Sequence, residues 1–291
     1  MAVFDRYGIV LAGGTGSRLF PLTRGVNKHL LQIYDKPMIY YALSVLMLAK
    51  IRRICIVCRR EDQTSYKNLL GSGYRFGITI TYIIQSEASG IADGIALCRH
   101  VVGNSSLAVV LGDNLFVGSG LTPLLARAQK RVVGATIFAY EVKHASDFGV
   151  VSLDVTGTPV AIEEKPENPS SNLAITGLYF FDNKAFEVID RLKPSLRGEL
   201  EVTDLVANYM VQNALNVEIL GRGFAWLDTG TTQSLIRASG FIESIEVNQG
   251  LKIACLEEIA LNHGWIDNLV LASSPDFNIK NSYGDYLRSL V

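Results

Sequence analysis

The stretch that decides the fold is Gly8-Ile-Val-Leu-Ala-Gly-Gly-Thr-Gly-Ser-Arg-Leu19, near the start of the chain. Its first five residues are mostly apolar and predict a buried β-strand. The glycines that follow let the backbone turn tightly and approach a ligand closely. Successive N–H groups in such a loop can surround a phosphate oxygen, and the forked guanidinium of Arg18 suits a triphosphate. The stretch therefore indicates a phosphate-binding loop at the end of a strand.

Strand and helix patterns alternate along the chain around this loop. Apolar runs rich in β-branched residues predict strands at 8–12, 53–58, 78–85, 107–111, 135–142, 149–153, 178–181 and 217–220. Helical spacing predicts helices at 38–49, 91–101, 121–130, 184–192, 203–212 and 233–245. The alternation predicts an α/β fold, with a mostly parallel central sheet flanked by helices. Residues 1–240 are expected to form the core and residues 241–291 a helical segment packed on it, in a single structural domain.

Two other glycine-loop motifs match the first stretch less well. Gly14-x-Gly16-x-x-Leu19 resembles the dinucleotide fingerprint, but leucine stands where a third Gly or Ala belongs. No well-placed acidic residue follows about 20 residues on, as that fingerprint requires. The P-loop motif needs Gly-Lys-Ser/Thr after four spacers, which this loop lacks. An ordinary strand-to-helix turn is the remaining alternative for the loop taken alone.

The charge and hydropathy pattern argues against two kinds of partner. The chain carries 27 basic and 28 acidic side chains with no long run of one sign, so it lacks the basic footprint of a nucleic-acid-binding protein. No run of about 18 apolar residues predicts a membrane span. The first residues lack the apolar segment and cleavage site of a signal peptide, so we expect a cytoplasmic protein.

The four cysteines are predicted to be buried, reduced thiols. Cys55 and Cys58 form a C-x-x-C motif, which is also typical of redox or zinc sites. They lie in Arg53-Ile-Cys-Ile-Val-Cys-Arg59, a run that predicts a strand. Because side chains three residues apart on a strand point to opposite faces, the two thiols are not expected to meet.

Three motifs in order resemble the sugar nucleotidyltransferase family. They are Leu11-Ala-Gly-Gly-Thr-Gly-Ser-Arg-Leu19, Lys28-His-Leu-Leu31 and Asp35-Lys-Pro-Met-Ile-Tyr-Tyr41. The similarity runs from about residue 7 to about residue 251. It implies a Rossmann-like nucleotidyltransferase fold and an enzyme that joins a nucleoside triphosphate to a hexose 1-phosphate with release of pyrophosphate. It also implies a Mg²⁺ cofactor and a homotetramer with an allosteric nucleotide site between subunits.

Two aspartates are candidates for holding the metal ion. Asp113 follows the apolar run Leu107-Ala-Val-Val-Leu111, and ligands of open α/β sheets bind at the carboxyl ends of strands. Asp228 lies in Trp226-Leu-Asp-Thr-Gly230, before a Thr-Gly turn. Magnesium uses one or two carboxylates, with waters and phosphates as its other ligands. An aspartate capping a helix or turn is the alternative for each alone, but the resemblance places metal ligands at both positions.

The resemblance assigns roles to further residues. The catalytic cations are Arg18, Lys28 and Lys165, and because Lys28 lies ten residues after Arg18, an intervening loop would return it to the same phosphates. The nucleotide-binding residues are Leu11, Gly13, Gly14, Thr15, Gly16, Ser17, Gln85, Gly90 and Asp113. The sugar-binding residues are Asn114, Gly149, Glu164, Lys165, Ile175, Tyr179 and Trp226.

The segment Glu163-Glu-Lys-Pro166 is predicted to face the sugar phosphate. Alternation along an extended segment would put Glu164 and Lys165 on opposite faces, one on the sugar hydroxyls and the other on the phosphate. A second acidic cluster is interpreted as a helix start without a chemical role, with Thr203 or Asp204 as its cap; its members are Glu199, Glu201 and Asp204.

The nucleotide base is expected to contact Gln85 and Gly90. The Gln85 amide alone discriminates poorly, because it can present either a donor or an acceptor. The Gly90 N–H cannot flip, so it suits the O4 acceptor of thymine or uracil and opposes the amino group of cytosine. We therefore expect dTTP to be the best nucleotide, with UTP usable and CTP and GTP poor. The resemblance implies glucose 1-phosphate as the second substrate and dTDP-glucose as the product.

Two departures from the family pattern leave alternatives open. Asp93 is a carboxylate that would recruit an amino group, and Phe148 lacks a hydroxyl that is frequent near the sugar. A uridylyltransferase or cytidylyltransferase of the same family is therefore the alternative. More distant alternatives are a regulatory homologue that only binds nucleotide sugars and a nicotinamide-dependent oxidoreductase.

Overall fold

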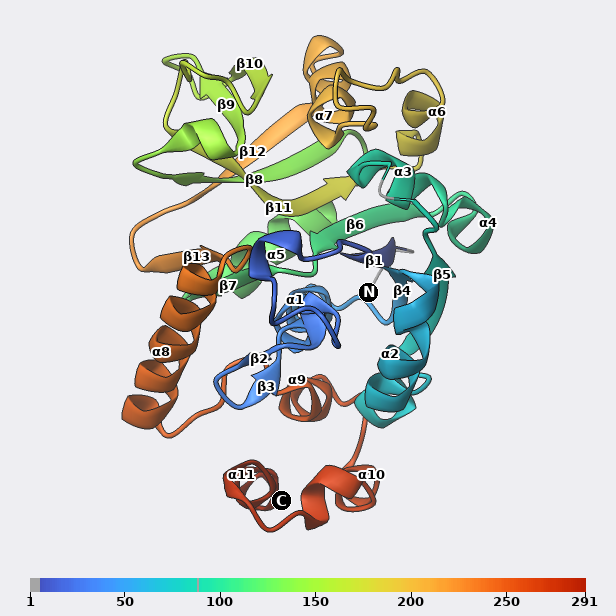
Figure 1. Ribbon diagram of the computed structural model, residues 1–291, viewed down its shortest axis with the longest axis vertical. Helices are drawn as coiled ribbons and strands as arrows, with labels where there is room; N and C mark the ends of the chain where they lie inside the picture. Colours follow the sequence, from blue (N-terminus) through green and yellow to red (C-terminus); the bar gives the residue numbers. More distant parts are fainter. Residues whose placement is uncertain (1–5, 88) are drawn as a thin grey trace.

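A nine-stranded sheet forms the centre of the molecule in this computed structural model, which describes residues 6–87 and 89–291 (Figure 1). The strands are β1 (Arg6–Ala12), β4 (Arg53–Cys58), β5 (Thr79–Ile84), β6 (Ser106–Leu111), β8 (Ala135–Glu141), β9 (Gly149–Leu153), β10 (Pro159–Glu164), β11 (Leu173–Phe181) and β12 (Leu215–Leu220). Their order is β10-β9-β11-β6-β1-β4-β5, and β8 pairs with β11 and β12. Only β10 and β11 run against the other seven strands. The predicted α/β class and mostly parallel sheet are confirmed.

Helices cover both faces of this sheet. One face packs against α1 (Ile39–Leu48), α2 (Gln63–Leu70), α5 (Leu121–Lys130) and α9 (Leu256–Asn262). The other packs against α3 (Ile91–Ala96), α4 (Arg99–Val102), α6 (Ala185–Ile189) and α7 (Val202–Val211). In Figure 1, α1, α2 and α9 lie below the sheet and α3, α6 and α7 lie above it. The result is a three-layer arrangement with a separate apolar cluster on each face.

The central strands are buried on both sides because their sequences are apolar throughout. Neighbouring residues alternate between the two clusters: Ile9 enters one and Val10 the other. Cys55 and Cys58 also enter opposite clusters, and all four cysteines are free and buried. The prediction of buried, reduced thiols is confirmed.

Parallel pairing brings the carboxyl ends of four strands to one edge of the sheet. The register pairs Leu11 with Leu111, Ala12 with Cys58, and Cys58 with Ile84. The residues that follow three of these strands therefore emerge together; they are Gly13, Gln85 and Asp113. β11 extends beyond the end of β6, and there its residue Ala174 pairs with Val150 of β9. The β9–β10 hairpin therefore continues the same edge of the sheet.

A two-stranded ribbon completes this edge. It consists of β7 (Asn114–Gly118) and β13 (Phe224–Asp228), which pair antiparallel with Asp228 opposite Asn114. The pairing brings the two predicted metal ligands to neighbouring positions. The sequence patterns did not predict these strands, because each is short and finds its partner far along the chain.

Other elements also differ from the sequence-based prediction. Helix α2 was not predicted, because only Tyr66 and Leu70 of its eight residues are buried and its apolar periodicity is weak. The predicted helix over 91–101 is divided into α3 and α4, and β11 begins five residues earlier than predicted. A short pair, β2 (Gln32–Ile33) and β3 (Lys36–Pro37), was also missed.

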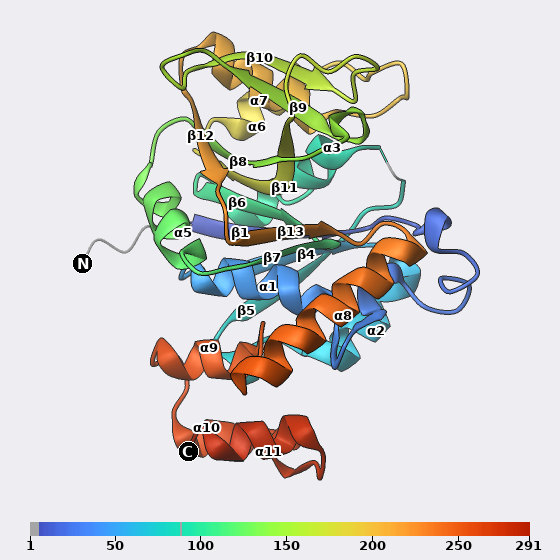
Figure 2. The same cartoon turned by 90° about the vertical axis from the view of Figure 1, so that its left-hand side faces the viewer.

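The C-terminal part of the chain is helical. Helix α8 (Thr232–Gln249) starts at a capping box in which Ser234 N donates to Thr231 Oγ1, and it crosses residue 240 without interruption. Helices α9, α10 (Asn268–Ala272) and α11 (Ser282–Ser289) follow, with α10 and α11 farthest from the sheet (Figure 2). Leu256, Leu271 and Leu287 belong to the same apolar cluster as α1. The division of the chain at residue 240 stays a prediction.

A helix with the length and apolar character needed to span a lipid bilayer is absent from the described residues.

Candidate active site

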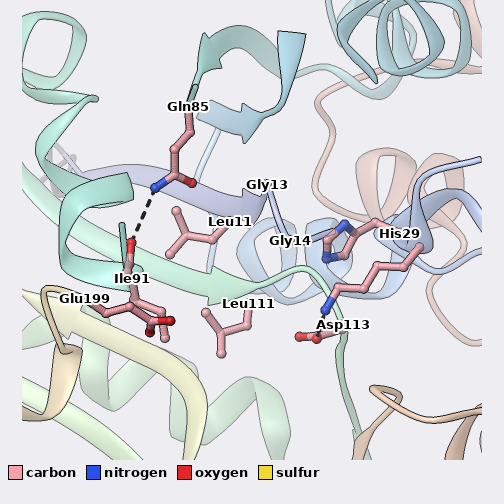
Figure 3. A pocket seen from close by; sticks show the side chains of 11 residues that line it. Leu11, Gly13, Gly14, His29, Gln85, Ile91, Leu111, Asp113 and Glu199 are labelled. Atoms are coloured by element: carbon pink, nitrogen blue, oxygen red, sulfur yellow. Dashed lines mark hydrogen bonds and ion pairs between the residues drawn. The ribbon is translucent and has the colours of Figure 1, made fainter. Parts of the chain in front are cut away.

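Two adjoining cavities open where the strands end. The smaller, of about 220 Å³, has largely apolar walls and contains the Gln85 amide. The larger, of about 850 Å³, is lined by many charged and polar side chains. Ile91, Leu111 and Asp113 line both, so the cavities meet at Asp113. Figure 3 shows the smaller cavity, with Gln85 at one end and Asp113 at the other.

The glycine-rich loop forms one wall of the smaller cavity. A Cβ added at Gly13 would lie 2.7 Å from Gln85 Oε1, and one at Gly14 would lie 3.3 Å from Lys28 Cε. Gly16 adopts the left-handed conformation with φ 66°, and Thr23 Oγ1 donates to its carbonyl oxygen at 2.9 Å. The left-handed turn therefore requires glycine at position 16, while Gly13 and Gly14 leave room for the ends of the Gln85 and Lys28 side chains. The chain returns Lys28 to this loop, and the contact of Lys28 with the same phosphates as Arg18 stays a prediction.

Asp113 is held as a carboxylate at the junction of the cavities. Lys28 Nζ forms an ion pair with Asp113 Oδ2, and Asn114 Nδ2 donates to Oδ1 at 3.0 Å. Burial by itself raises the pKa of Asp113, but the Lys28 ammonium and these hydrogen bonds outweigh burial and hold the pKa well below its usual range. The side chain is therefore ionised at neutral pH.

Asp228 lies beside Asp113. Thr229 N and Thr229 Oγ1 donate to the Asp113 carbonyl oxygen at 3.1 and 2.8 Å, which ties the end of β13 to the end of β6. Burial, and then the negative charge of Asp113, raise the pKa of Asp228, with Arg18 and Lys28 acting in the opposite direction. Two neighbouring carboxylates in a partly enclosed position form an anionic site that a divalent cation would neutralise.

The donor set at this junction fits magnesium. The described residues contain no cluster of three or more His, Cys, Asp or Glu side chains that would enclose a metal ion. A cation here would therefore take its protein ligands from Asp113 and Asp228. Magnesium is bound in this way in nucleotide sites, where substrate phosphates and waters complete the octahedron.

Arg18 reaches the same junction from the glycine-rich loop. It lies on the 3-10 turn Ser17–Leu19 and lines the larger cavity together with Asp228. A Cβ added at Gly230 would lie 2.8 Å from Arg18 Nη2, so glycine at this position leaves room for the guanidinium. Gly230 N also donates to Asp228 Oδ1 at 3.0 Å. The Thr-Gly turn after Asp228 therefore positions both the carboxylate and the arginine.

The far end of the smaller cavity is formed by Gln85 and the segment after it. Gln85 Nε2 donates to Asp93 Oδ2 at 3.0 Å and lies 3.4 Å from the Gly90 carbonyl oxygen. Leu200 N donates to Ser89 O at 2.8 Å, and Ala92 N donates to Leu200 O at 3.1 Å. Because a Cβ at Gly90 would lie 2.5 Å from Leu200 O, this contact requires glycine. The segment before α7 thus supports the wall of the cavity.

The larger cavity contains a polar network around Glu164. Arg197 Nη2 donates to Glu164 Oε1 at 2.9 Å, and Thr203 Oγ1 donates to Glu164 Oε2 at 3.0 Å. Arg197 also pairs with Glu201 at 2.9 Å. Both carboxylate oxygens of Glu164 are thus oriented by side chains from the segment around the start of α7.

Two predictions about these segments are wrong. Lys165 does not lie on the face opposite Glu164, because both side chains line the larger cavity. Lys165 has φ 42°, which ends the strand alternation, and its Nζ lies 3.9 Å from Glu164 Oε1. Thr203 and Asp204 are not helix caps, since α7 begins after Glu201 without a side-chain cap, and Thr203 donates to Glu164 instead.

An aromatic wall closes the larger cavity near Asn114. Trp226 Nε1 donates to Asn114 Oδ1 at 2.6 Å, and Gly177 N donates to the same oxygen at 3.1 Å. The rings of Trp226 and Phe148 lie 4.9 Å apart between centroids. Asn114 therefore holds three elements of the site together while its amide N–H orients Asp113.

Most of the predicted site residues lie on one of the two cavities. The smaller cavity is lined by Leu11, Gly13, Gly14, Lys28, Gln85, Gly90 and Asp113. The larger is lined by Arg18, Asp113, Asn114, Gly149, Glu164, Lys165, Ile175, Tyr179, Trp226 and Asp228. Thr15, Gly16 and Ser17 do not line either cavity and continue the loop around them.

The sequence-based prediction missed several side chains at the site, including Glu199 on the smaller cavity and Arg237 on the larger one. Arg197 and Thr203 hold Glu164 from 33 and 39 residues away, and no local pattern signals such contacts. His29 lines the smaller cavity beside Lys28, and its Nδ1 lies 2.8 Å from Asn27 Oδ1. Burial, together with the Lys28 charge, lowers the pKa of His29 to about 3, so the ring is neutral at pH 7. In the sequence, the position of His29 next to Lys28 was the one feature that could have indicated that His29 lies at the site.

Comparisons with known proteins show which family the chain resembles over most of its length. A family model described as nucleotidyl transferase matches residues 7–245. The glucose-1-phosphate thymidylyltransferase of Neisseria meningitidis serogroup A is 51% identical over 284 residues, which cover 98% of this chain and 99% of that protein. The protein of the same name from Xanthomonas campestris pv. campestris is 51% identical over 287 residues, with 99% and 97% covered. A similar fold is found in a crystal structure from Bacillus anthracis, of a protein assigned as a glucose-1-phosphate thymidylyltransferase in complex with sucrose. The match has a TM-score of 0.76 and 40% sequence identity, and it covers 81% of this chain and 94% of that chain.

Proposed function

The chain belongs to the nucleotidyl transferase family, and from this premise we propose that it joins dTTP to glucose 1-phosphate, giving dTDP-glucose and pyrophosphate. Relatives that share about half of its residues over nearly the whole chain carry the name of this activity. The observation that carries the proposal is the meeting of the two cavities at Asp113. A flat base fits the smaller, mostly apolar cavity and a hexose fits the larger, polar one. The phosphates of the two substrates would then meet at the junction.

The proposed reaction is a direct displacement at phosphorus. A phosphate oxygen of glucose 1-phosphate attacks the α-phosphorus of dTTP, the bond between the α-phosphorus and the bridging oxygen breaks, and pyrophosphate leaves with that oxygen. No covalent enzyme intermediate is needed. Reactions of this kind depend mainly on positioning and on neutralisation of phosphate charge, which suits a site with several cations around one junction.

The proposed roles follow from where the side chains lie. Lys28 and Lys165 would hold the attacking phosphate near the α-phosphorus, and Arg18 would neutralise the departing pyrophosphate. Backbone N–H groups of residues 13–17 would donate to the nucleotide phosphates. Mg²⁺ held by Asp113 and Asp228 would add positive charge on the phosphate oxygens. Glu164, oriented by Arg197 and Thr203, would accept hydrogen bonds from hexose hydroxyls.

The nucleotide preference tests the proposed substrate. With glucose 1-phosphate, we expect kcat/KM to fall in the order dTTP, UTP, CTP. The thymine methyl is worth about 1–3 kcal/mol in a fitted pocket, and an unpaired buried donor facing the cytosine amino group costs about 1–3 kcal/mol. Pyrophosphate release over a grid of nucleotides and sugar phosphates measures the order, with reactions lacking the sugar phosphate as the blank. Comparable kcat/KM for CTP and dTTP would point to a cytidylyltransferase.

We further propose a homotetramer with an allosteric nucleotide site between subunits. Large apolar side chains exposed on α8 support an interface there: Ile236 is 63% exposed and Val247 is 64% exposed. We expect light scattering at micromolar concentration to give four times the 31.8 kDa mass of the chain. Inhibition by dTDP-glucose that excess dTTP does not relieve would support the second site. A monomer would contradict the proposal.

A further inference from the structure

The Gln85 side chain has one fixed orientation at the end of the smaller cavity. Its Nε2 donates to the Asp93 carboxylate at 3.0 Å and lies 3.4 Å from the Gly90 carbonyl oxygen. A carboxylate and a carbonyl group only accept hydrogen bonds. Rotating the amide by 180° would place Oε1 against both acceptors and leave Nε2 without them. The two contacts therefore distinguish the amide oxygen from the amide nitrogen by chemistry.

This orientation presents an acceptor to the cavity. Gln85 Oε1 lies over Gly13, where an added Cβ would be 2.7 Å away, and Figure 3 shows it on the side of the amide that faces the glycine loop. None of the hydrogen bonds found among residues 6–87 and 89–291 uses this oxygen. A base entering between Gly13 and Ile91 would thus meet a carbonyl oxygen that is ready to accept.

Asp93 itself stays behind this wall. It lies on α3 and lines neither the smaller nor the larger cavity. Its carboxylate is turned to Gln85 Nε2, so it is not presented to an amino group of a bound base. Its effect on the base would therefore pass through Gln85.

We propose that Asp93 is a positioning residue that selects bases with an N–H donor at the ring nitrogen facing Gln85. Thymine and uracil carry a hydrogen on N3 and would donate to Gln85 Oε1, whereas N3 of cytosine is an acceptor and would oppose it. The inference rests on the proposed function, in which the smaller cavity holds the base. It makes the acidic side chain at position 93 a determinant of thymine and uracil preference.

The test is the nearly isosteric variant Asp93→Asn. An asparagine amide can either accept from Gln85 Nε2 or donate to Oε1, so only the longer contact with the Gly90 carbonyl oxygen, at 3.4 Å, still favours the original orientation of the Gln85 amide. The ratio of kcat/KM for dTTP to that for CTP is expected to fall by about tenfold, with the KM for glucose 1-phosphate unchanged. The ratio compares two substrates on one preparation, so a partly unfolded variant does not alter it. Asp285→Asn, which removes an exposed carboxylate paired with Arg288 on α11, is the matched control and should keep the wild-type ratio.

The same substitution in a Gln85→Ala variant tests whether Asp93 acts on the base through Gln85 or by direct contact. In Gln85→Ala, the further change Asp93→Asn should leave the ratio within about twofold, because the side chain through which Asp93 acts is gone. An unchanged ratio in Asp93→Asn would overturn the role of Asp93, and so would an equal shift in the Gln85→Ala background. A wild-type enzyme that does not turn over dTTP would overturn the proposed function instead, and it is measured before any variant.

Discussion

Asp113→Asn is expected to lower kcat with dTTP and glucose 1-phosphate by at least about 10²–10³-fold, the loss found when one group that stabilises developing charge is removed. An amide in this position does not offset the charge of a divalent cation. It also forms no ion pair with the Lys28 ammonium, which is paired with Asp113 in the wild-type protein. Pyrophosphate release at saturating Mg²⁺ measures the loss. Activity within about threefold of wild type would remove Asp113 from the metal site.

Asp228→Asn should cause a comparable loss of activity with a different effect on stability. In the absence of metal, Asp113→Asn removes the carboxylate that pairs with Lys28. The melting temperature of this variant should therefore fall, by about 2–4 °C for each kcal/mol of unfolding free energy lost. Asp228→Asn instead removes one of two carboxylates that repel each other, as the raised pKa of Asp228 indicates. Its melting temperature in EDTA should equal or exceed that of wild type. Two inactive variants with opposite thermal shifts would show that the loss of activity is not a loss of fold. A lower melting temperature for Asp228→Asn would contradict the proposed repulsion.

The parts of the fold that depend on local pattern were predictable from the sequence. β4 was predicted at its observed bounds, because the five residues that follow Arg53 are all apolar and buried. The position of Asp113 at the site followed from its place after β6, since parallel strands bring their carboxyl ends to one edge. A separation of ten residues allowed Lys28 to return to the loop but did not require it, since an extended segment of ten residues spans about 33 Å.

The parts that depend on distant pairing were not predictable. Asp228 reaches Asp113 through the ribbon of β7 and β13, and five-residue strands carry too little pattern to reveal a partner so far along the chain. Lys165 departs from strand alternation because of one positive φ angle, which its sequence neighbours do not signal. Gln85 seemed free to present either end of its amide until its contact with Asp93 was known. In these three cases, a strand pairing, a backbone angle and a side-chain contact decided what the local pattern left open.

Arg18→Lys is expected to lower kcat/KM by about 10²–10³-fold although it keeps the positive charge. The planar guanidinium presents two parallel donors to phosphate oxygens, whereas an ammonium presents a single point of charge on a flexible stem. The structure adds a second reason. Gly230 leaves a space that the guanidinium fills, with a Cβ position only 2.8 Å from Nη2, and a lysine side chain would leave this space open beside Asp228. Initial rates of pyrophosphate release over a range of dTTP concentrations measure the effect.

Arg24→Lys is the matched control for this variant. Arg24 lies six residues further along the same loop, where its guanidinium stacks 5.0 Å from the Phe20 ring centroid, and it lines neither cavity. The same chemical change at this position should leave kcat/KM within about twofold of wild type, since it meets no substrate phosphate. If Arg18→Lys also stayed within about threefold, the forked donors would not be needed and a positive charge at this position would be sufficient. A large loss confined to Arg18 would instead place the guanidinium on the phosphates, because the two variants differ only in whether the side chain reaches the junction of the cavities.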